Sequence, residues 1–372
     1  MRIAVPKETA PLERRVGLVP DGVAKLVKAG HAIVVEQGAG SSAGIPDAAF
    51  TGAGAVTAAD FAGTVAGADL VAKVQRPSPG EVALLPEGSL LVSYLQPAAQ
   101  PELLAALAAR KVTAFAMELV PRTTKAQSID SLSSQATVAG YKAVLLGAST
   151  LPKLLPMLTT AAGTLAPARV FVLGAGVAGL QAIATARRLG AIVSAFDVRP
   201  VVKEQVQSLG AAFVEAEAVS SAAEGAGGYA KELAEEQQKK VLEAIGKVLP
   251  TSDLVISTAA IPGRPAPRLI TKEMVATMPA GAVIIDVAAE TGGNCELTRA
   301  GETVMANGVT ILGPVNLAST VPLHASQMYG RNVLTLLQHL LTKDGAFQVD
   351  VADEITGAMA VTHGGAVRFP AS

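Results

Sequence analysis

The sequence predicts an α/β protein with two Rossmann-like domains, in which parallel sheets flanked by helices lie on either side of a cleft. Two observations support this class. Apolar strand-like runs alternate with helical segments in both halves of the chain, and the second half carries a glycine-rich turn between such a run and a helical segment. The length of 372 residues fits two domains of ordinary size, and a hydrophobic content of 50% supplies a core for each.

The first half alternates strands and helices up to about residue 135. Apolar runs predict strands at residues 2–5, 33–36, 69–74, 89–94 and 112–116. Helical spacing predicts helices at residues 21–30, 47–51 and 101–110. A late helix, at about residues 323–341, leads back to this domain. We therefore expect a discontinuous first domain of residues 1–135 plus 320–372, with residues 136–319 forming the second.

The second domain contains the most informative stretch, which ends at Asp197. An apolar run at 170–173 predicts a buried strand, helical spacing follows over 180–189, and a second apolar run occupies 191–196. Between the first strand and the helix the pattern G-x-G-x-x-G is formed by Gly174, Gly176 and Gly179. This order, with an acid after the second strand, is typical of a dinucleotide-binding unit.

Each residue type in this unit has a physical reason. Gly174 permits a tight turn, Gly176 lets the backbone approach a pyrophosphate, and Gly179 lets the helix pack closely on the strand. The helix start offers free N–H groups and a positive dipole end to the phosphates. The predicted cofactor-binding residues are Gly174, Gly176, Val177, Ala178, Gly179, Asp197, Val198 and Arg199.

Asp197 bears on which nucleotide binds. Its carboxylate can accept hydrogen bonds from an adenosine ribose and would repel a 2′-phosphate, which favours NAD over NADP. Arg199 lies two residues further on and would soften that repulsion. The sequence thus favours NAD(H) as the cofactor of this domain, although the positive charge of Arg199 would reduce the repulsion of an NADP(H) 2′-phosphate.

Composition narrows the function classes. A formal net charge of −1 argues against a nucleic-acid partner. Cys295 is the only cysteine, so the chain cannot form an internal disulfide. No Cys or His lies near it in the sequence that could complete a metal site. No run of 18 apolar residues and no signal peptide is evident in the sequence. We therefore expect no metal site and no membrane span.

A polar stretch between the two domains, residues 121–135, reads PRTTKAQSIDSLSSQ. It follows a predicted strand and precedes an apolar helix at residues 136–147. One interpretation is a helix cap, in which Ser128 or Asp130 serves as the N-cap. The other is a functional loop, since a cap explains one polar residue and not a cluster.

Several segments together resemble the NAD(H)-binding component of proton-translocating nicotinamide nucleotide transhydrogenase. The segments are RTTKAQSIDSLSSQATVAGYKAVLLGA, VLGAGVAGLQAIATARRLGA, GGYAKE, STAAIPGRPAPRLI and IIDVAAETGGNCELT. The resemblance covers nearly the whole chain. It implies a catalytic cluster at the nicotinamide end of the site, formed by Arg122, Gln127, Asp130 and Ser133. It also implies that Asp197 holds the adenosine ribose and that Tyr229 lies on a mobile loop that closes over the nucleotide.

The resemblance also implies partners. The family forms homodimers and works with two other components, an NADP(H)-binding domain and a membrane proton channel. The chain ends at Ser372 without a membrane segment, so it resembles the form in which this component is a separate subunit. The expected location is cytoplasmic, peripheral at the inner face of the cell membrane through those partners.

The reaction implied is hydride transfer between NADH and NADP⁺, coupled to proton translocation. Such a transfer needs no proton donor in the site; it needs two apposed rings and the exclusion of water. Asp130 can accept a hydrogen bond from a carboxamide or from Arg122, Ser133 adds a hydroxyl, and Gln127 is long enough to reach the other nucleotide.

Alanine dehydrogenase is the main alternative, because the two families share a two-domain plan. Arg15 in ERRVGLVP and Lys73 in VAKVQRP resemble its substrate-binding segments. That enzyme also needs an acid–base group, yet Gln96 stands where the family has a histidine, and Glu290 where it has an aspartate. Arg15 and Lys73 would then be structural, holding the two domains together. A nucleotide sensor without turnover is disfavoured, since it needs no hydride geometry.

Overall fold

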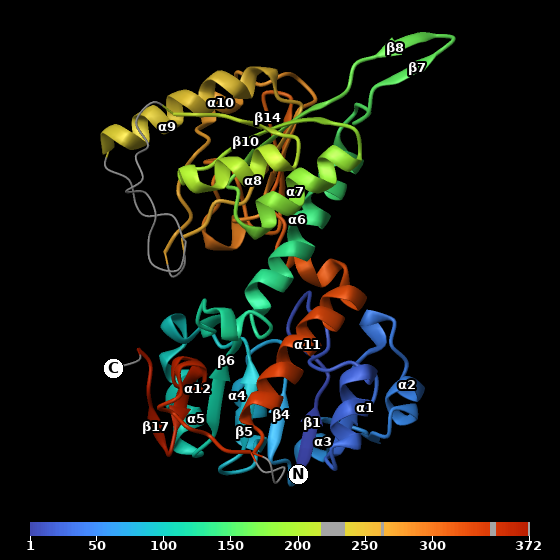
Figure 1. The fold of residues 1–372 in the computed structure, drawn as a ribbon, viewed down its shortest axis with the longest axis vertical. Helices are drawn as coiled ribbons and strands as arrows, with labels where there is room; N and C mark the ends of the chain where they lie inside the picture. The colour runs from blue at the N-terminus through green and yellow to red at the C-terminus, as the bar shows by residue number, and fades with distance from the viewer. Residues whose placement is uncertain (217–234, 262–263, 343–346, 371–372) are drawn as a thin grey trace. The chain divides into compact units, whose positions relative to one another are not determined.

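The computed structural model describes residues 1–216, 235–261, 264–342 and 347–370, and the predicted lid residue Tyr229 lies outside them. The chain divides into two units. The first unit is Met1–Gln135 with Ala318–Ser372, and the second unit is Ala136–Leu317. Both are built from a mainly parallel sheet with helices on its two faces, so the predicted α/β class is confirmed (Figure 1).

The sheet of the first unit has the order β17-β16-β6-β5-β4-β1-β2-β3. Its strands are β1 (Arg2–Val5), β2 (Ala32–Glu36), β3 (Val56–Ala58), β4 (Leu70–Ala72), β5 (Leu90–Ser93), β6 (Thr113–Ala116), β16 (Ala360–His363) and β17 (Ala366–Val367). Strands β1 to β6 pair in parallel, whereas β16 is antiparallel to β6 and β17 to β16. The C-terminal segment thus adds an antiparallel edge to a parallel sheet.

Helices cover both faces of this sheet. The helices are α1 (Pro20–Lys28), α2 (Asp47–Gly52), α3 (Phe61–Val65), α4 (Pro79–Leu84), α5 (Pro101–Ala109), α11 (Pro322–Leu340) and α12 (Glu354–Met359). The sequence of β1 is a continuous apolar run because both faces of the strand are buried. Ile3 and Val5 join the core under α1, α2, α11 and α12, and Ala4 joins the core under α3 to α5. A strand covered on both faces has no polar side.

The sheet of the second unit has the order β11-β10-β9-β12-β13-β15-β14. Its strands are β9 (Arg169–Leu173), β10 (Ile192–Phe196), β11 (Ala212–Phe213), β12 (Leu254–Ser257), β13 (Val283–Asp286), β14 (Thr303–Ala306) and β15 (Val309–Leu312). All neighbours pair in parallel except β14 with β15. A separate exposed hairpin consists of β7 (Leu158–Thr160) and β8 (Gly163–Leu165).

The helices of the second unit also form two layers. They are α6 (Ser131–Thr150), which contains the boundary between the units, α7 (Val177–Arg188), α8 (Lys203–Ser208), α9 (Glu235–Val248) and α10 (Lys272–Val275). On β9, Val170 and Val172 face the core under α6 to α8, and Phe171 and Leu173 face the core under α9 and α10. None of the helices in the described parts of the chain has the length and hydropathy needed to cross a bilayer.

The differences from the sequence prediction lie mainly at short elements and sheet edges. The helix predicted at 136–147 begins five residues earlier, at Ser131, and runs to Thr150. Strand β3, helices α3 and α4 and the β7–β8 hairpin were not predicted, since runs of three to six residues give little periodicity. The predicted parallel sheets carry antiparallel strands at one edge each.

Candidate functional site

The glycine turn between β9 and α7 is shaped by close contacts within the second unit. Gly174 has φ +87°, a conformation that side chains rarely adopt. A Cβ at Gly179 would lie 1.8 Å from the carbonyl oxygen of Gly174, so only glycine lets the helix pack against the turn. A Cβ at Gly140 of α6 would lie 2.1 Å from the carbonyl oxygen of Ala178. The start of α7 is therefore held tightly from two sides.

Gly176 differs from the other two glycines of the motif. Its φ of −74° suits any residue, and a Cβ built there would meet no heavy atom of the described residues within 4 Å. It is the N-cap of α7 and has no side chain to cap the amides of the first turn. Neither its backbone conformation nor packing against the described residues explains a glycine here, whereas the close approach of a phosphate would.

Asp197 follows β10 and is connected to the glycine turn. The amide of Ala175 donates to Asp197 Oδ2 over 2.7 Å. Arg199 donates to the same carboxylate through its backbone N–H (2.8 Å to Oδ1), Nε (2.9 Å to Oδ1) and a terminal nitrogen (2.9 Å to Oδ2). Val198 packs against the core under α9 and α10. The structure thus brings together the glycines, Val177, Ala178, Asp197 and Arg199, with Asp197 already paired.

A second polar group at this edge was not singled out from the sequence. The hydroxyl of Thr258, directly after β12, donates to the carbonyl oxygen of Gly174 over 3.0 Å. Asn294 is fully buried; it accepts a hydrogen bond from Ser257 Oγ and donates to the carbonyl of Ala259. The available signal was the polar pair Ser257 and Thr258 at the carboxyl end of a buried strand, because such ends meet at one edge of a parallel sheet.

The predicted catalytic loop lies in the first unit. Arg122 and Gln127 are exposed on either side of a 3₁₀ turn, Thr124–Ala126. Ala126 and Ile129 are buried in the core of the unit and anchor the loop. The fixed backbone therefore presents two long polar side chains to the surface.

Asp130 and Ser133 form a helix cap. Asp130 Oδ1 accepts the backbone N–H of Ser133 over 2.9 Å, and Ser133 Oγ donates to Asp130 Oδ2 over 2.6 Å. This arrangement explains why α6 begins at Ser131, and it realises the capping interpretation for Asp130. A cap of this kind also holds the carboxylate in one place, so the two interpretations of the loop are compatible.

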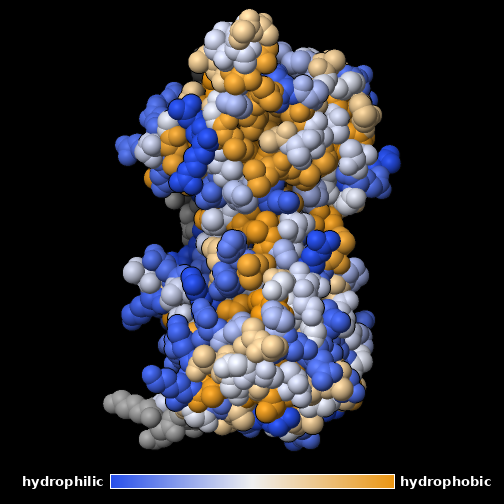
Figure 2. Space-filling model, turned by 90° about the vertical axis from the view of Figure 1, so that its right-hand side faces the viewer, coloured by the Kyte–Doolittle hydropathy of each residue, from blue (hydrophilic) through white to orange (hydrophobic). Residues whose placement is uncertain are grey.

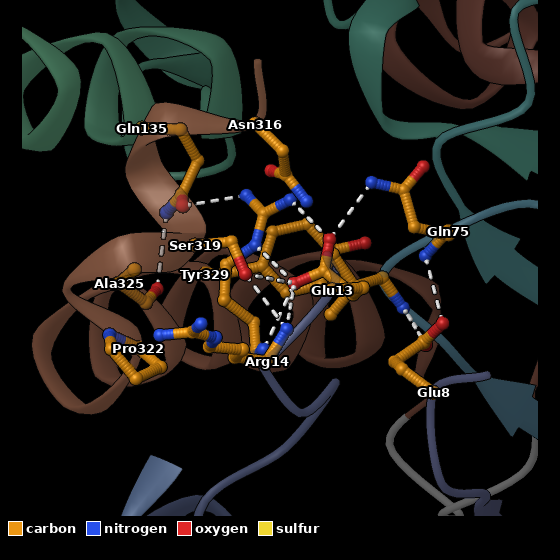
Figure 3. Close-up of polar contacts among 12 residues, drawn as sticks. Glu8, Glu13, Arg14, Gln75, Gln135, Asn316, Ser319, Pro322, Ala325 and Tyr329 are labelled. Carbon is orange, nitrogen blue, oxygen red and sulfur yellow. Dashed lines mark hydrogen bonds and ion pairs between the residues drawn. The ribbon is translucent and has the colours of Figure 1, made fainter. Parts of the chain in front are cut away.

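The turn after β1 is filled by buried charges of the first unit, several of which are drawn in Figure 3. Arg15 is 4% exposed and donates to both oxygens of Glu13, over 2.8 and 2.7 Å, and to Gln135 Oε1 over 2.8 Å. Burial works against ionisation of Glu13, but the hydrogen bonds and charge of Arg15 prevail and hold its pKa at about 2. Gln75 and Ser319 donate to the same carboxylate.

Lys73 and Glu8 form a second buried group beside it. Lys73 Nζ lies 3.1 Å from Glu81 Oε1 and 3.6 Å from Glu8 Oε2. Glu8 Oε1 accepts the amide of Val74 over 2.6 Å. Burial raises the pKa of Glu8 to about 7, against the opposing charge of Lys73. Arg15 and Lys73 are therefore paired with carboxylates of their own unit.

Gln96 is the residue that we compared with the histidine of alanine dehydrogenase, and its side chain is exposed. Gln96 has φ +51°, and its Oε1 accepts a hydrogen bond from Arg76 over 2.6 Å. Its backbone N–H donates to Glu118, whose carboxyl pKa is raised by burial. Glu290, the residue at the aspartate position, is exposed in the second unit and accepts the amide of Asn316 over 3.3 Å. A neutral amide cannot carry a proton at any accessible pH.

Two family models match the chain. Residues 4–139 match the alanine dehydrogenase/PNT N-terminal domain, and residues 143–370 match the alanine dehydrogenase/PNT C-terminal domain. Together they span both units. The predicted relationship to these two kinds of enzyme is confirmed.

Individual relatives show whether the chain is more similar to transhydrogenases or to alanine dehydrogenases. The chain is 50% identical to an NAD(P) transhydrogenase subunit alpha chain of Rhodospirillum rubrum, over 100% of this chain and 98% of the relative. A crystal structure of transhydrogenase from Sinorhizobium meliloti superimposes with a TM-score of 0.90 at 44% identity, covering 99% and 100% of the two chains. The alanine dehydrogenase of Halomonas elongata is 34% identical over 95% of this chain and 91% of the relative. The chain belongs to the alanine dehydrogenase/PNT family, and these two transhydrogenase relatives are more similar to it than that alanine dehydrogenase.

Proposed function

We propose that this chain is the NAD(H)-binding subunit of an NAD(P) transhydrogenase, which passes hydride between NADH and NADP⁺. The names and identities of the transhydrogenase relatives support this activity. The observation within the chain that carries it is Gly176. Neither its own backbone nor the described residues around it require a glycine, which supports the approach of another molecule to the turn.

The residues of the glycine turn fit a dinucleotide. The uncapped start of α7 offers N–H groups and a positive dipole end to the pyrophosphate, and the carboxylate of Asp197 offers acceptors to the adenosine ribose. The nicotinamide of the bound cofactor supplies the hydride. What the chain contributes is binding, orientation and the exclusion of water.

We assign the orienting role to the loop that holds Arg122, Gln127, Asp130 and Ser133. The cap fixes Asp130 and Ser133 relative to each other, and Arg122 and Gln127 are exposed beside it. A hydride acceptor on another molecule requires side chains that are both anchored and accessible. This loop has both properties.

The finer assembly is also a proposal. The chain carries one G-x-G-x-x-G motif in the second unit, so NADP(H) would arrive on a partner chain, and a membrane subunit would couple the reaction to proton translocation at the inner face of the membrane. A homodimer is supported by the apolar side chains exposed around the β7–β8 hairpin, among them Met157 (64% exposed) and Leu165 (55%). Figure 2 shows the apolar residues gathered on this face of the second unit.

Alanine dehydrogenase activity is the second candidate, favoured by the family and by Arg15 and Lys73. Oxidation of an amino acid requires a group that accepts a proton, and Gln96 cannot do so. The discriminating assay is pyruvate- and ammonia-dependent oxidation of NADH by the purified chain. We expect none, and measurable turnover would favour this candidate instead.

The main test separates binding from transfer. Stopped-flow hydride transfer from NADH to an NADP⁺ analogue is measured with the NADP(H)-binding partner present, alongside fluorescence titration of NADH. Gln127→Asn and Arg122→Ala should leave NADH affinity within about threefold and slow transfer roughly 100-fold, the scale of about 1 Å of misplacement. Lys125→Ala, an exposed residue of the same loop, is the matched control and should transfer at the unmodified rate.

Two outcomes would contradict the loop assignment. Unmodified transfer rates in both variants would make the loop only a helix cap. Loss of NADH binding in both would place it in the binding pocket, without a role in orientation. Failure of the unmodified chain to bind NADH would overturn the proposed function as a whole.

A further inference from the structure

In the second unit, hydrogen bonds connect the carboxyl ends of three neighbouring strands, β9, β12 and β13. Directly after β9, the carbonyl oxygen of Gly174 accepts the hydroxyl of Thr258 over 3.0 Å. At the end of β13, the fully buried Asp286 accepts the amide of Cys295 over 2.9 Å. The side chain of Asn294, the residue before Cys295, lies between these two points and joins the end of β13 to the chain that follows β12.

The amide group of Asn294 is fully buried and uses both of its polar atoms. Its Oδ1 accepts the hydroxyl of Ser257, the last residue of β12, over 2.6 Å. Its Nδ2 donates to the carbonyl oxygen of Ala259 over 2.8 Å and to that of Pro267 over 2.9 Å. A side-chain amide has two N–H donors, so both are committed to the chain beyond the end of β12. Asn294 therefore fixes this chain at two points that lie outside the strand.

One of these points, Ala259, lies directly against the glycine turn. A Cβ built on Gly174 would lie 3.0 Å from the amide nitrogen of Ala259. The next residue, Ala260, is exposed. Strand β9 lies between β10 and β12, and the direction of strand order reverses here. Because ligands of such sheets bind outside the carboxyl ends of the strands at this reversal, Ala259 belongs to the edge that a dinucleotide would occupy.

The two sides of the glycine turn would meet different halves of the dinucleotide. In the proposed function, Asp197 binds the adenosine ribose, and it follows β10 on one side of β9. The pyrophosphate lies at the turn after β9. The nicotinamide half then extends toward β12 on the other side, where Asn294 holds Ala259.

We propose that Asn294 is a positioning residue for the nicotinamide half of the bound nucleotide, and that it acts by holding Ala259 beside the glycine turn. This inference rests on the proposed function, in which the second unit binds NAD(H). The buried amide touches no nucleotide; it sets where the chain after β12 stands relative to the turn. Its removal should weaken contacts to the nicotinamide half and spare the adenosine half, which a general loss of stability would not do.

The test compares NADH with ADP, which ends at the pyrophosphate and lacks the nicotinamide half. Dissociation constants of both are measured by calorimetric titration. Asn294→Asp keeps an oxygen for the Ser257 hydroxyl but replaces both N–H donors by an oxygen that faces two carbonyls. It should weaken NADH at least about 10-fold, the scale of one buried polar group left unpaired, and keep ADP within about threefold.

Hydride transfer gives a second readout. Stopped-flow transfer to an NADP⁺ analogue is measured at saturating NADH with the NADP(H)-binding partner present. Asn294→Asp should slow it roughly 100-fold, the scale of about 1 Å of misplacement. Asn294→Ser removes the amide without adding a charge, and it should show the same difference between NADH and ADP.

Ser252→Ala is the matched control for lost stability. Ser252 is 2% exposed, and its hydroxyl donates to the carbonyl oxygen of Val248 over 3.0 Å, before the start of β12 and at the opposite end of this strand. This variant should lower the midpoint of thermal unfolding and change neither the two dissociation constants nor the transfer rate.

Two results would overturn the inference. If both Asn294 variants weaken NADH and ADP by the same factor, Asn294 supports the fold of the unit and not one half of the nucleotide. If both bind NADH and transfer hydride as the unmodified chain does, Ala259 does not need to be held by Asn294. Either result leaves the proposed function intact, because NADH binding to the unmodified chain tests that separately.

Discussion

In both units the strand that comes first lies between the second and the fourth strand of its sheet. The orders β3-β2-β1-β4-β5 and β11-β10-β9-β12-β13 correspond strand for strand. The direction of strand order reverses beside β1 in one sheet and beside β9 in the other. Ligands of such sheets bind at this point, outside the carboxyl ends of the strands.

One hydrogen bond is also repeated. Glu36, the last residue of β2, accepts the amide of Lys7, two positions after β1, over 2.9 Å. Asp197, directly after β10, accepts the amide of Ala175, two positions after β9, over 2.7 Å. In each unit an acidic residue at the end of the second strand thus accepts a hydrogen bond from the turn that follows the first strand.

The turns themselves differ. After β9 the chain enters α7 within three residues, and Gly176 leaves space beside the backbone. After β1 the chain takes fourteen residues, 6–19, to reach α1, and Glu8, Glu13 and Arg15 are buried there. The same topological position is kept open in one unit and filled by ion pairs in the other. The two turns therefore differ in their contents and not in their topology.

The largest effect on stability is expected in the filled turn, by which we mean residues 6–19 with their buried ion pairs. Arg15→Ala removes the cation that balances the buried Glu13 and should lower the free energy of unfolding of the first unit by about 3–5 kcal/mol. Urea unfolding, with hydrogen exchange of peptides from β1 and β4, reports on this unit. Glu13→Gln/Arg15→Met, which leaves no buried charge, should recover most of the loss. A cost below about 1 kcal/mol for Arg15→Ala would mean that the pair does not support the turn.

Two substitutions in the glycine turn after β9 should separate effects on stability from effects on NADH binding. Gly179→Ala places a Cβ against the Gly174 carbonyl and should destabilise the second unit by about 3 kcal/mol. Gly176→Ala meets no atom of the described chain and should cost less than about 1 kcal/mol. It should nevertheless weaken NADH about 100-fold, because the methyl group occupies the space of the pyrophosphate. Thermal unfolding and NADH titration of both variants measure the two quantities.

The comparison between the glycines has a clear way to fail. Unchanged NADH affinity in Gly176→Ala would mean that the space beside this residue is not used by the nucleotide. Equal destabilisation by both substitutions would mean that Gly176 is, like Gly179, a packing residue.

The sequence was sufficient for elements buried on both faces. The runs at 2–5 and 170–173 were predicted within a residue of β1 and β9, since a strand covered on two sides is apolar on both faces. Strands β14 to β17 were not predicted. Strand β14 pairs with β15, and β16 with β17, across two-residue turns. Strand β16 also pairs with β6 across a long stretch of sequence, and this pairing depends on tertiary contacts that no local pattern contains.

The shape of the glycine turn could be predicted where conformation or packing limits the residue type. Gly174 has a positive φ, and a Cβ at Gly179 would collide with the Gly174 carbonyl. The pairing of Arg199 with both oxygens of Asp197 was not evident from spacing, since it depends on side-chain rotamers. The buried network of Glu8, Glu13 and Lys73 was also missed, because nothing local in the sequence shows that a long polar turn folds inward.

The smallest expected effect is the pH dependence of the filled turn. Burial raises the pKa of Glu8 to about 7 in the folded protein, above the ordinary value of 4.5 that applies when the chain is unfolded. A raised folded pKa means that the folded state binds the proton more tightly, so the stabilisation is complete below about pH 4.5 and is lost as the pH rises through about 7. The first unit should lose roughly 2 kcal/mol of unfolding free energy between about pH 5 and pH 8.5.

Glu8→Gln isolates this contribution from every other titrating group. The amide keeps an oxygen that can accept the Val74 N–H, and Lys73 retains Glu81, so the turn stays paired without a proton on residue 8. The difference in unfolding free energy between the unmodified chain and Glu8→Gln should change by roughly 2 kcal/mol across this pH range, in the direction that favours the variant at high pH. A difference that stays constant with pH would show that Glu8 is ionised throughout, and that the filled turn is balanced by Lys73 alone.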